Sequence, residues 1–162
     1  MSRGSFPGRF SILLFGSLLL ANVTQAQAPV GKSTDDLVNE ARAQITEVTP
    51  ATASEARNAG AVILDVREAH EYKKGHVPGA VNVPRGVLEF RIDELEVFED
   101  LTDEARFDKP ILVYCRSGKR AALATARLQE MGYADVKSIE GGYKAWIAEG
   151  LPVEMPGEKS ER

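Results

Sequence analysis

The stretch PILVYCRSGKR (110–120) joins an apolar run to a basic turn, and it contains the only cysteine of the chain, Cys115. The run Ile111–Tyr114 predicts a buried strand, and the apolar spacing of Lys119–Met131 predicts a helix directly after the turn. A cysteine between a parallel strand and a helix faces the first N–H groups of that helix, which lack partners within the helix and favour an anion. We therefore expect Cys115 to be a reactive thiolate.

Further strands and helices alternate on both sides of this stretch. The apolar segments predict strands at 46–48, 61–65, 80–83 and 136–139. Helices are predicted from Ser33 or Thr34 to Ile45, at 50–58, 68–74 and 86–91, and from Gly141 onward. The acidic segment 93–108 has no clear period and predicts a surface excursion with some helix. Alternating strands and helices predict a three-layer α/β fold, a mainly parallel sheet flanked by helices on both faces.

The first residues resemble an export signal. A basic start is followed by the apolar stretch 10–21 and by Ala26-Gln27-Ala28, a small-residue cleavage pattern. Cleavage after Ala28 or after Ala26 fits this pattern. The apolar stretch is shorter than the roughly 20 residues that a membrane-spanning helix needs, and no cysteine closely follows it to carry a lipid. We expect a soluble protein without a stable membrane anchor, periplasmic or secreted.

The rest of the chain has the length of one domain. We predict a signal peptide at 1–28, a linker and packing helix at 29–45, a single domain at 46–153 and a polar tail at 154–162. The net charge of −4 argues against nucleic acid as a partner. A single cysteine forms no internal disulfide, so a free thiol in an oxidising compartment indicates a chemical role.

The residues after Cys115 suit the binding of a small anion. A short turn before a helix can aim several backbone amides at one point, and Gly118 tolerates backbone angles that a side chain forbids. Arg116, Lys119 and Arg120 add positive charge, which stabilises a thiolate and attracts an oxyanion. Asp65 ends the neighbouring predicted strand, where ligands of parallel sheets bind.

Three segments in this order and spacing resemble the single-domain rhodaneses, members of the sulfurtransferase family: LDVREAHEYKKGHVPGAVNVP (64–84), VYCRSGKRA (113–121) and EGGYKAW (140–146). The resemblance implies that Cys115 is the nucleophile and that 115–120 forms the substrate cradle, with Ser117 among its binding residues. It implies a thiolate that takes the outer sulfur of thiosulfate or a related anionic donor, becomes a persulfide and passes the sulfur to cyanide, a thiol or a thiol-bearing protein. This chemistry needs no metal and no cofactor.

The same resemblance assigns supporting roles. Asp65 and Arg67 match the family's Asp-x-Arg, and we expect them to brace the cradle. His76 falls in the family's structural turn, and neither it nor His70 is expected to bind metal. Further expectations name Arg116 as the main donor-binding cation and Arg91 at the pocket rim. Tyr143 and Trp146 are expected to pack the last helix against the sheet.

Two other kinds of function would use the same fold or the same cysteine. Phosphatases and arsenate reductases of the same fold need a loop one residue longer, Cys-x5-Arg, whereas here Arg120 closes the loop and Ala121 holds the next position. A persulfide carrier or sulfur-sensing module would use the same cysteine without repeated turnover. The sequence favours a sulfurtransferase of the thiosulfate type.

Overall fold

A computed structural model describes residues 31–155, and the predicted signal peptide and most of the polar tail lie outside these residues. Helix α1 (Thr34–Arg42) begins where the sequence predicts. The Ser33 hydroxyl accepts from the Asp36 amide at 3.1 Å, while the Asp36 carboxylate accepts from the Ser33 amide at 2.9 Å. This reciprocal pair fixes the start of the helix. None of the helices within 31–155 combines the length and the apolar character that crossing a bilayer requires.

The strands form one parallel sheet in the order β1-β5-β4-β2-β3. They are β1 (Thr46–Val48), β2 (Val62–Asp65), β3 (Val81–Asn82), β4 (Ile111–Tyr114) and β5 (Val136–Ile139). The predicted α/β fold with a mainly parallel sheet is therefore confirmed. The residues of β2 and β4 are all buried, as a central parallel strand covered on both faces requires.

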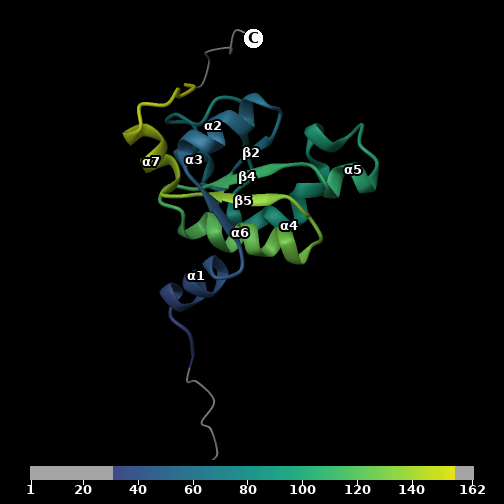
Figure 1. Cartoon of the computed structure of the whole chain (residues 1–162). Coiled ribbons are helices and arrows are strands. Elements are labelled where there is room, and N and C mark those ends of the chain that lie inside the picture. Colours follow the sequence, from purple (N-terminus) through teal and green to yellow (C-terminus); the bar gives the residue numbers. More distant parts are fainter. Residues whose placement is uncertain (1–30, 156–162) are drawn as a thin grey trace, which may run out of the picture. The chain divides into compact units, whose positions relative to one another are not determined.

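Helices cover both faces of the sheet (Figure 1). They are α1 (Thr34–Arg42), α2 (Pro50–Asn58), α3 (Ala69–Tyr72), α4 (Leu88–Arg91), α5 (Asp103–Phe107), α6 (Lys119–Glu130) and α7 (Gly142–Ala148). Helices α2 and α7 pack on one face, α4 and α6 on the other, and α1 lies against the outer side of α6. Short 3₁₀ turns at Arg85–Val87, Ile92–Glu94 and Glu96–Phe98 complete the chain between β3 and α5.

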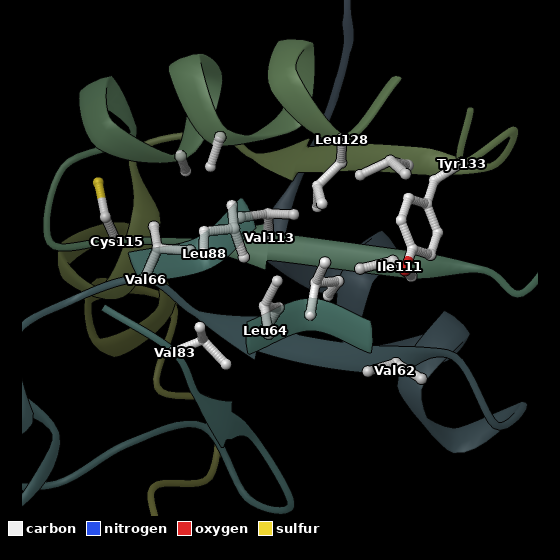
Figure 2. Packing of buried hydrophobic residues seen from close by; sticks show 14 of the residues in the cluster. Val62, Leu64, Val66, Val83, Leu88, Ile111, Val113, Cys115, Leu128 and Tyr133 are labelled. Atoms are coloured by element: carbon white, nitrogen blue, oxygen red, sulfur yellow. The ribbon is translucent and has the colours of Figure 1, made fainter. Parts of the chain in front are cut away.

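Two apolar clusters hold these layers together. One fills the space between the sheet and α6 and contains Val113, Leu128 and the cysteine Cys115 (Figure 2). The other lies under α2 and α7 and centres on Tyr114 and the fully buried Trp146. Alternate residues of β4 thus point to opposite faces, which directs Cys115 toward α6.

Several local predictions need correction. Of the apolar residues in the helix predicted from Ser33 or Thr34 to Ile45, Val38 and Ala41 are buried, whereas 44% of Leu37 is exposed. The helix ends at Arg42, before Ile45. Strand β3 covers only Val81–Asn82 of the predicted 80–83. The acidic segment 93–108 contains 3₁₀ turns and the short helix α5, in line with the partial helix expected there. Over so few helical turns the spacing of apolar residues is a weak signal, because tertiary packing determines which side of the helix is buried.

The register brings the chemistry-bearing residues to one edge. Asp65 pairs with Tyr114 across β2 and β4, so the residue after each strand lies at the same carboxyl edge. Cys115 follows Tyr114 directly. In parallel sheets this edge is where ligands bind, because helix N-termini and loops converge there.

Candidate active site

Cys115 lies between the end of β4 and the first turn of α6. Its side chain is only 1% exposed, and its sulfur points toward the start of that helix (Figure 2). Gly118 precedes the helix with φ +90° and ψ −26°, a left-handed conformation that L side chains rarely adopt. This turn lets the chain fold back over the thiol within a few residues.

The backbone of the loop presents amides without partners. Within 31–155, the N–H groups of 116–121 donate to no backbone or side-chain acceptor of the protein. The carbonyls of Cys115 and Arg116 accept instead from the amides of Tyr143 and Lys144, at 2.8 and 3.1 Å. Because C=O and N–H of a trans peptide point in opposite directions, the amides of Arg116 and Ser117 face away from α7. Such a row of N–H groups is a ready site for an anion.

Close packing of α7 holds this arrangement. Gly142 has φ +59°, and a Cβ there would lie 2.3 Å from the Cys115 carbonyl oxygen and 3.0 Å from the Gly118 nitrogen. Only a residue without a side chain allows α7 to approach the loop so closely. The loop therefore rests on the N-terminus of α7 as well as on α6.

The three cations of the loop differ in their surroundings. Lys119 is paired with Asp35 of α1, with 2.6 Å between Nζ and Oδ1. Arg120 is paired with Glu71 of α3, with Nη1–Oε2 at 2.8 Å and Nη2–Oε1 at 3.0 Å. Arg116 is exposed and forms no ion pair with any residue of the described chain. Of the three, it is the one whose charge is not balanced by a nearby acid there.

Arg120 connects the thiol to α3. The hydrogen bonds to Glu71 raise the pKa of the Arg120 guanidinium, and the adjacent Cys115 thiol contributes in the same direction. The same contact lowers the pKa of the Glu71 carboxyl. Sequence reasoning missed Glu71. It stands in the predicted helix just after Asp65-Val66-Arg67, but no local pattern indicates that it meets a residue on α6.

Asp65 and Arg67 form a buried ion pair. They are 0% and 3% exposed, and Arg67 Nη2 lies 2.6 Å from Asp65 Oδ2. Burial alone would lower the pKa of Arg67, but the hydrogen bonds and charge of Asp65 outweigh it and raise the pKa. Arg67 also donates to the Gly75 carbonyl at 2.9 Å, and its guanidinium lies 4.1 Å from the Tyr143 ring centre. The pair thus contacts the helix that supports the Cys115 loop, without touching the thiol itself.

The remaining predicted residues lie apart from the thiol. His76 is buried, stacks on Tyr72 with 3.7 Å between ring centres, and exchanges backbone hydrogen bonds with Glu154. Arg91 is exposed and paired with Glu94 rather than directed at the loop. Trp146 of α7 is buried against the sheet, as expected, and its indole N–H donates to the Pro152 carbonyl at 2.8 Å. Within residues 31–155, His, Cys, Asp and Glu side chains nowhere gather in groups of three or more that could hold a metal ion.

An open cleft lies elsewhere on the described part of the chain. It has a volume of about 1140 Å³ and is lined by the first residues of β2 and β3, Val62 and Val81, together with Arg57, Lys109 and Glu96. In a parallel sheet the first residues of the strands mark the edge opposite to Cys115. Its lining mixes both charges and lacks the thiol and the unpartnered amides of the cysteine loop.

Comparison with known proteins agrees with this geometry. A family model of the rhodanese-like domain matches residues 49–149. The chain is 30% identical over 105 residues to the thiosulfate sulfurtransferase GlpE of Pseudomonas savastanoi pv. phaseolicola, covering 65% of this chain and 90% of that protein. An α/β protein with a cysteine loop between strand and helix is thus the class that fold and site define. The chain belongs to the rhodanese-like family.

Solved structures of similar fold carry two kinds of description. A protein of unknown function from Rhodopseudomonas palustris, described as a possible tyrosine phosphatase, has a TM-score of 0.65 and 34% identity, covering 78% of this chain and 98% of that one. The polysulfide-sulfur transferase homodimer of Wolinella succinogenes has a TM-score of 0.59 and 29% identity, covering 77% and 89%. The similarity to the polysulfide-sulfur transferase and to the thiosulfate sulfurtransferase GlpE supports a sulfurtransferase.

Proposed function

We propose that the chain is an exported sulfurtransferase that carries one sulfur atom on Cys115 as a persulfide. The observation that carries this proposal is the row of unpartnered amides at 116–121 next to the only thiol of the chain. A buried charge is costly unless hydrogen-bond donors compensate it, and Cys115 is buried. These amides are the donors that a sulfur anion at this place needs.

The reaction consists of two displacements. The Cys115 thiolate attacks the outer sulfur of thiosulfate, the S–S bond of the donor breaks, and its electron pair leaves with sulfite. The Cys–S–S⁻ product keeps the negative charge. An acceptor such as cyanide or a thiolate then attacks the terminal sulfur, and the Cys115 thiolate returns as the leaving group. Covalent catalysis of this kind splits one transfer into two easier steps.

The cations of the loop would bind the donor and stabilise the departing sulfite. Arg116 is our choice for the main donor-binding residue, because its guanidinium is exposed and unpaired within 31–155. Lys119 and Arg120 assist, although each shares its charge with an acid. Ser117 and Gly118 contribute backbone amides to the same anion. Stabilising a developing charge with fixed donors is often the largest single contribution to catalysis.

The predicted signal at 1–28 supports a periplasmic or secreted location. In such a compartment the donor would be a small anionic sulfur compound, and the acceptor would be cyanide, a thiol or a thiol-bearing protein. The net charge of −4 makes nucleic acid an unfavourable partner. No cofactor or metal enters the two displacements as written.

Steady-state turnover tests the proposal. The protein is mixed with thiosulfate and cyanide, and the thiocyanate formed per chain is counted over time. We expect many turnovers for the wild type and none above background for Cys115→Ser. A yield that stops at one sulfur per chain would show a persulfide carrier instead.

The variant Arg116→Ala tests the role of this residue in donor binding. It should raise the thiosulfate concentration needed for half-maximal rate more than it slows transfer to cyanide. Equal losses in both steps would contradict the assigned role of Arg116.

A phosphatase is the second candidate, because of the similarity to the Rhodopseudomonas palustris protein. In this chain the loop closes at Arg120, one residue short of the Cys-x5-Arg that suits a tetrahedral phosphate. We therefore expect negligible hydrolysis of p-nitrophenyl phosphate under conditions that give full sulfur transfer. Efficient hydrolysis that is lost in Cys115→Ser would replace the sulfurtransferase proposal.

A further inference from the structure

Both carboxylate oxygens of Glu71 in α3 accept hydrogen bonds from Arg120 in the first turn of α6. The two hydrogen bonds measure 2.8 and 3.0 Å, and Arg120 belongs to the first turn of α6, toward which the sulfur of Cys115 points (Figure 2). We propose that Glu71 is a positioning residue for sulfur loading, which holds Arg120 in place at Cys115 while the donor is attacked. This inference deepens the proposed function and rests on it.

The carboxylate of Glu71 is itself held in place. Its Oε2 accepts from the Glu68 amide at 3.2 Å in addition to Arg120, within the reciprocal cap that starts α3. The side chain of Glu71 is 20% exposed, so solvent competes little for these bonds. A second acid, Glu68, lies 3.9 Å from Arg120 and forms no hydrogen bond with it. Glu71 is therefore the anchor, and Glu68 is a nearby acid that provides a matched control.

Arg120 needs such an anchor because its side chain is long and has many conformations. A guanidinium carries five N–H donors, so two bonds to a carboxylate leave donors for the thiolate, the donor anion or the departing sulfite. A two-point contact between a planar guanidinium and a carboxylate fixes both distance and direction. Arg120 would then stabilise the charge of the leaving sulfite without first having to be ordered.

A purely structural role makes a different prediction. The same carboxylate caps α3, so its loss could simply weaken that short helix and the loop around it. In that case removal of Glu71 would damage the protein whether or not Arg120 is present. If Glu71 acts through Arg120, its removal has no further effect once Arg120 is gone. A double-mutant cycle separates these two cases.

The experiment measures the rate at which Cys115 gains a sulfur atom from thiosulfate, by rapid quenching and intact-mass analysis. The chains compared are the wild type, Glu71→Ala, Glu71→Gln, Arg120→Ala, the Glu71→Ala/Arg120→Ala double variant and Glu68→Ala. We expect Glu71→Ala to slow loading about tenfold and Arg120→Ala at least as much. The double variant should match Arg120→Ala within about twofold. Glu71→Gln keeps one acceptor oxygen and should recover part of the rate, while Glu68→Ala stays near wild type.

Two results would overturn the assignment. One is a double variant that is slower than Arg120→Ala by the same factor that Glu71→Ala costs alone, since that shows independent roles. The other is an unchanged rate in Glu71→Ala. Circular dichroism identifies any variant that fails to fold, and Glu71→Gln then completes the cycle with Arg120→Ala. A wild type that gains no sulfur from thiosulfate refutes the proposed function itself, an outcome distinct from both.

Discussion

Helices α6 and α7 begin in the same way, yet their first amides have different partners. Each follows a glycine in the left-handed region, Gly118 and Gly141, and neither has a side-chain cap. The first amides of α7 donate to the carbonyls of Cys115 and Arg116, whereas those of α6 find no acceptor within 31–155. One helix end supports the loop, and the other is left open for an anion.

This difference shows that a local signal does not determine what a helix end does. A glycine before a helix predicts a tight turn and unsatisfied amides. Whether those amides support a loop or bind a ligand depends on what the fold places in front of them.

The largest effect is expected from Asp65→Ala, on the supporting side. The substitution leaves Arg67 buried without its partner, although that guanidinium also stacks near Tyr143 of α7. Breaking a buried pair in this way costs about 3–5 kcal/mol. Urea unfolding should show this loss, and sulfur loading should fall with it. A loss below about 1 kcal/mol would show that the pair does not brace the loop.

The substitution Gly142→Ala disrupts the close contact between α7 and the Cys115 loop. The new Cβ would meet the Cys115 carbonyl oxygen at 2.3 Å in a backbone conformation with φ +59°. We expect a loss of about 2–4 kcal/mol in stability and a large drop in loading, since strain and overlap add. Gly60→Ala is the matched control, because its φ is +95° but no atom lies within 4 Å of its added Cβ. Equal losses in the two variants would mean that the close approach of α7 is unimportant.

A smaller effect is expected on the pH dependence of stability, through the contact between Glu71 and Arg120 at the N-terminus of α6. The pKa of Glu71 is lowered from its ordinary value of 4.5 by its bonds to Arg120, so the folded protein binds that proton less readily than the unfolded chain. The contact therefore stabilises the fold above about pH 4.5 and loses its effect as the pH falls through the lowered pKa. Glu71→Gln should cost about 1 kcal/mol at pH 7 and much less at pH 3. A difference that is constant over this range would contradict the assigned cause.

The smallest effect is expected from Asp35→Asn. Its ion pair with Lys119 links α1 to the first residue of α6, but the two side chains are 71% and 56% exposed. Exposed pairs contribute little because water and salt screen them. Stability should change by less than about 0.5 kcal/mol in thermal unfolding. A larger loss would show that α1 holds the open helix end more firmly than its exposure indicates.

The sequence predicts the scaffold well and the contacts of the site less well. Apolar runs such as Ile111–Tyr114 and the periodic pattern of Lys119–Met131 are local, and the structure forms both elements there. The pairing of Glu71 with Arg120 joins segments 49 residues apart, and no periodicity reveals it. Periodicity likewise does not reveal the hydrogen bond from the Tyr143 amide to the Cys115 carbonyl or the ion pair between Asp35 and Lys119. Contacts of this kind follow from how helices pack, which the sequence specifies only through the whole fold.

The short elements between β3 and α5 were also hard to predict. The apolar residues of the acidic segment 93–108 follow no regular spacing, and its turns are held by scattered contacts such as the hydrogen bond that the Tyr133 hydroxyl donates to Asp93 at 2.9 Å. Phe98 is buried there, while its neighbour Val97 is 40% exposed. Without a repeated pattern, tertiary packing alone determines which of them turns inward.

The most direct test of the central claim is the intact mass of the protein after exposure to thiosulfate. The claim is that the amides at the open end of α6 keep Cys115 able to hold one sulfur atom. We predict a gain of one sulfur in the wild type that cyanide removes again, and no gain in Cys115→Ser. A wild-type mass that stays unchanged, or a gain that persists in Cys115→Ser, would contradict the account.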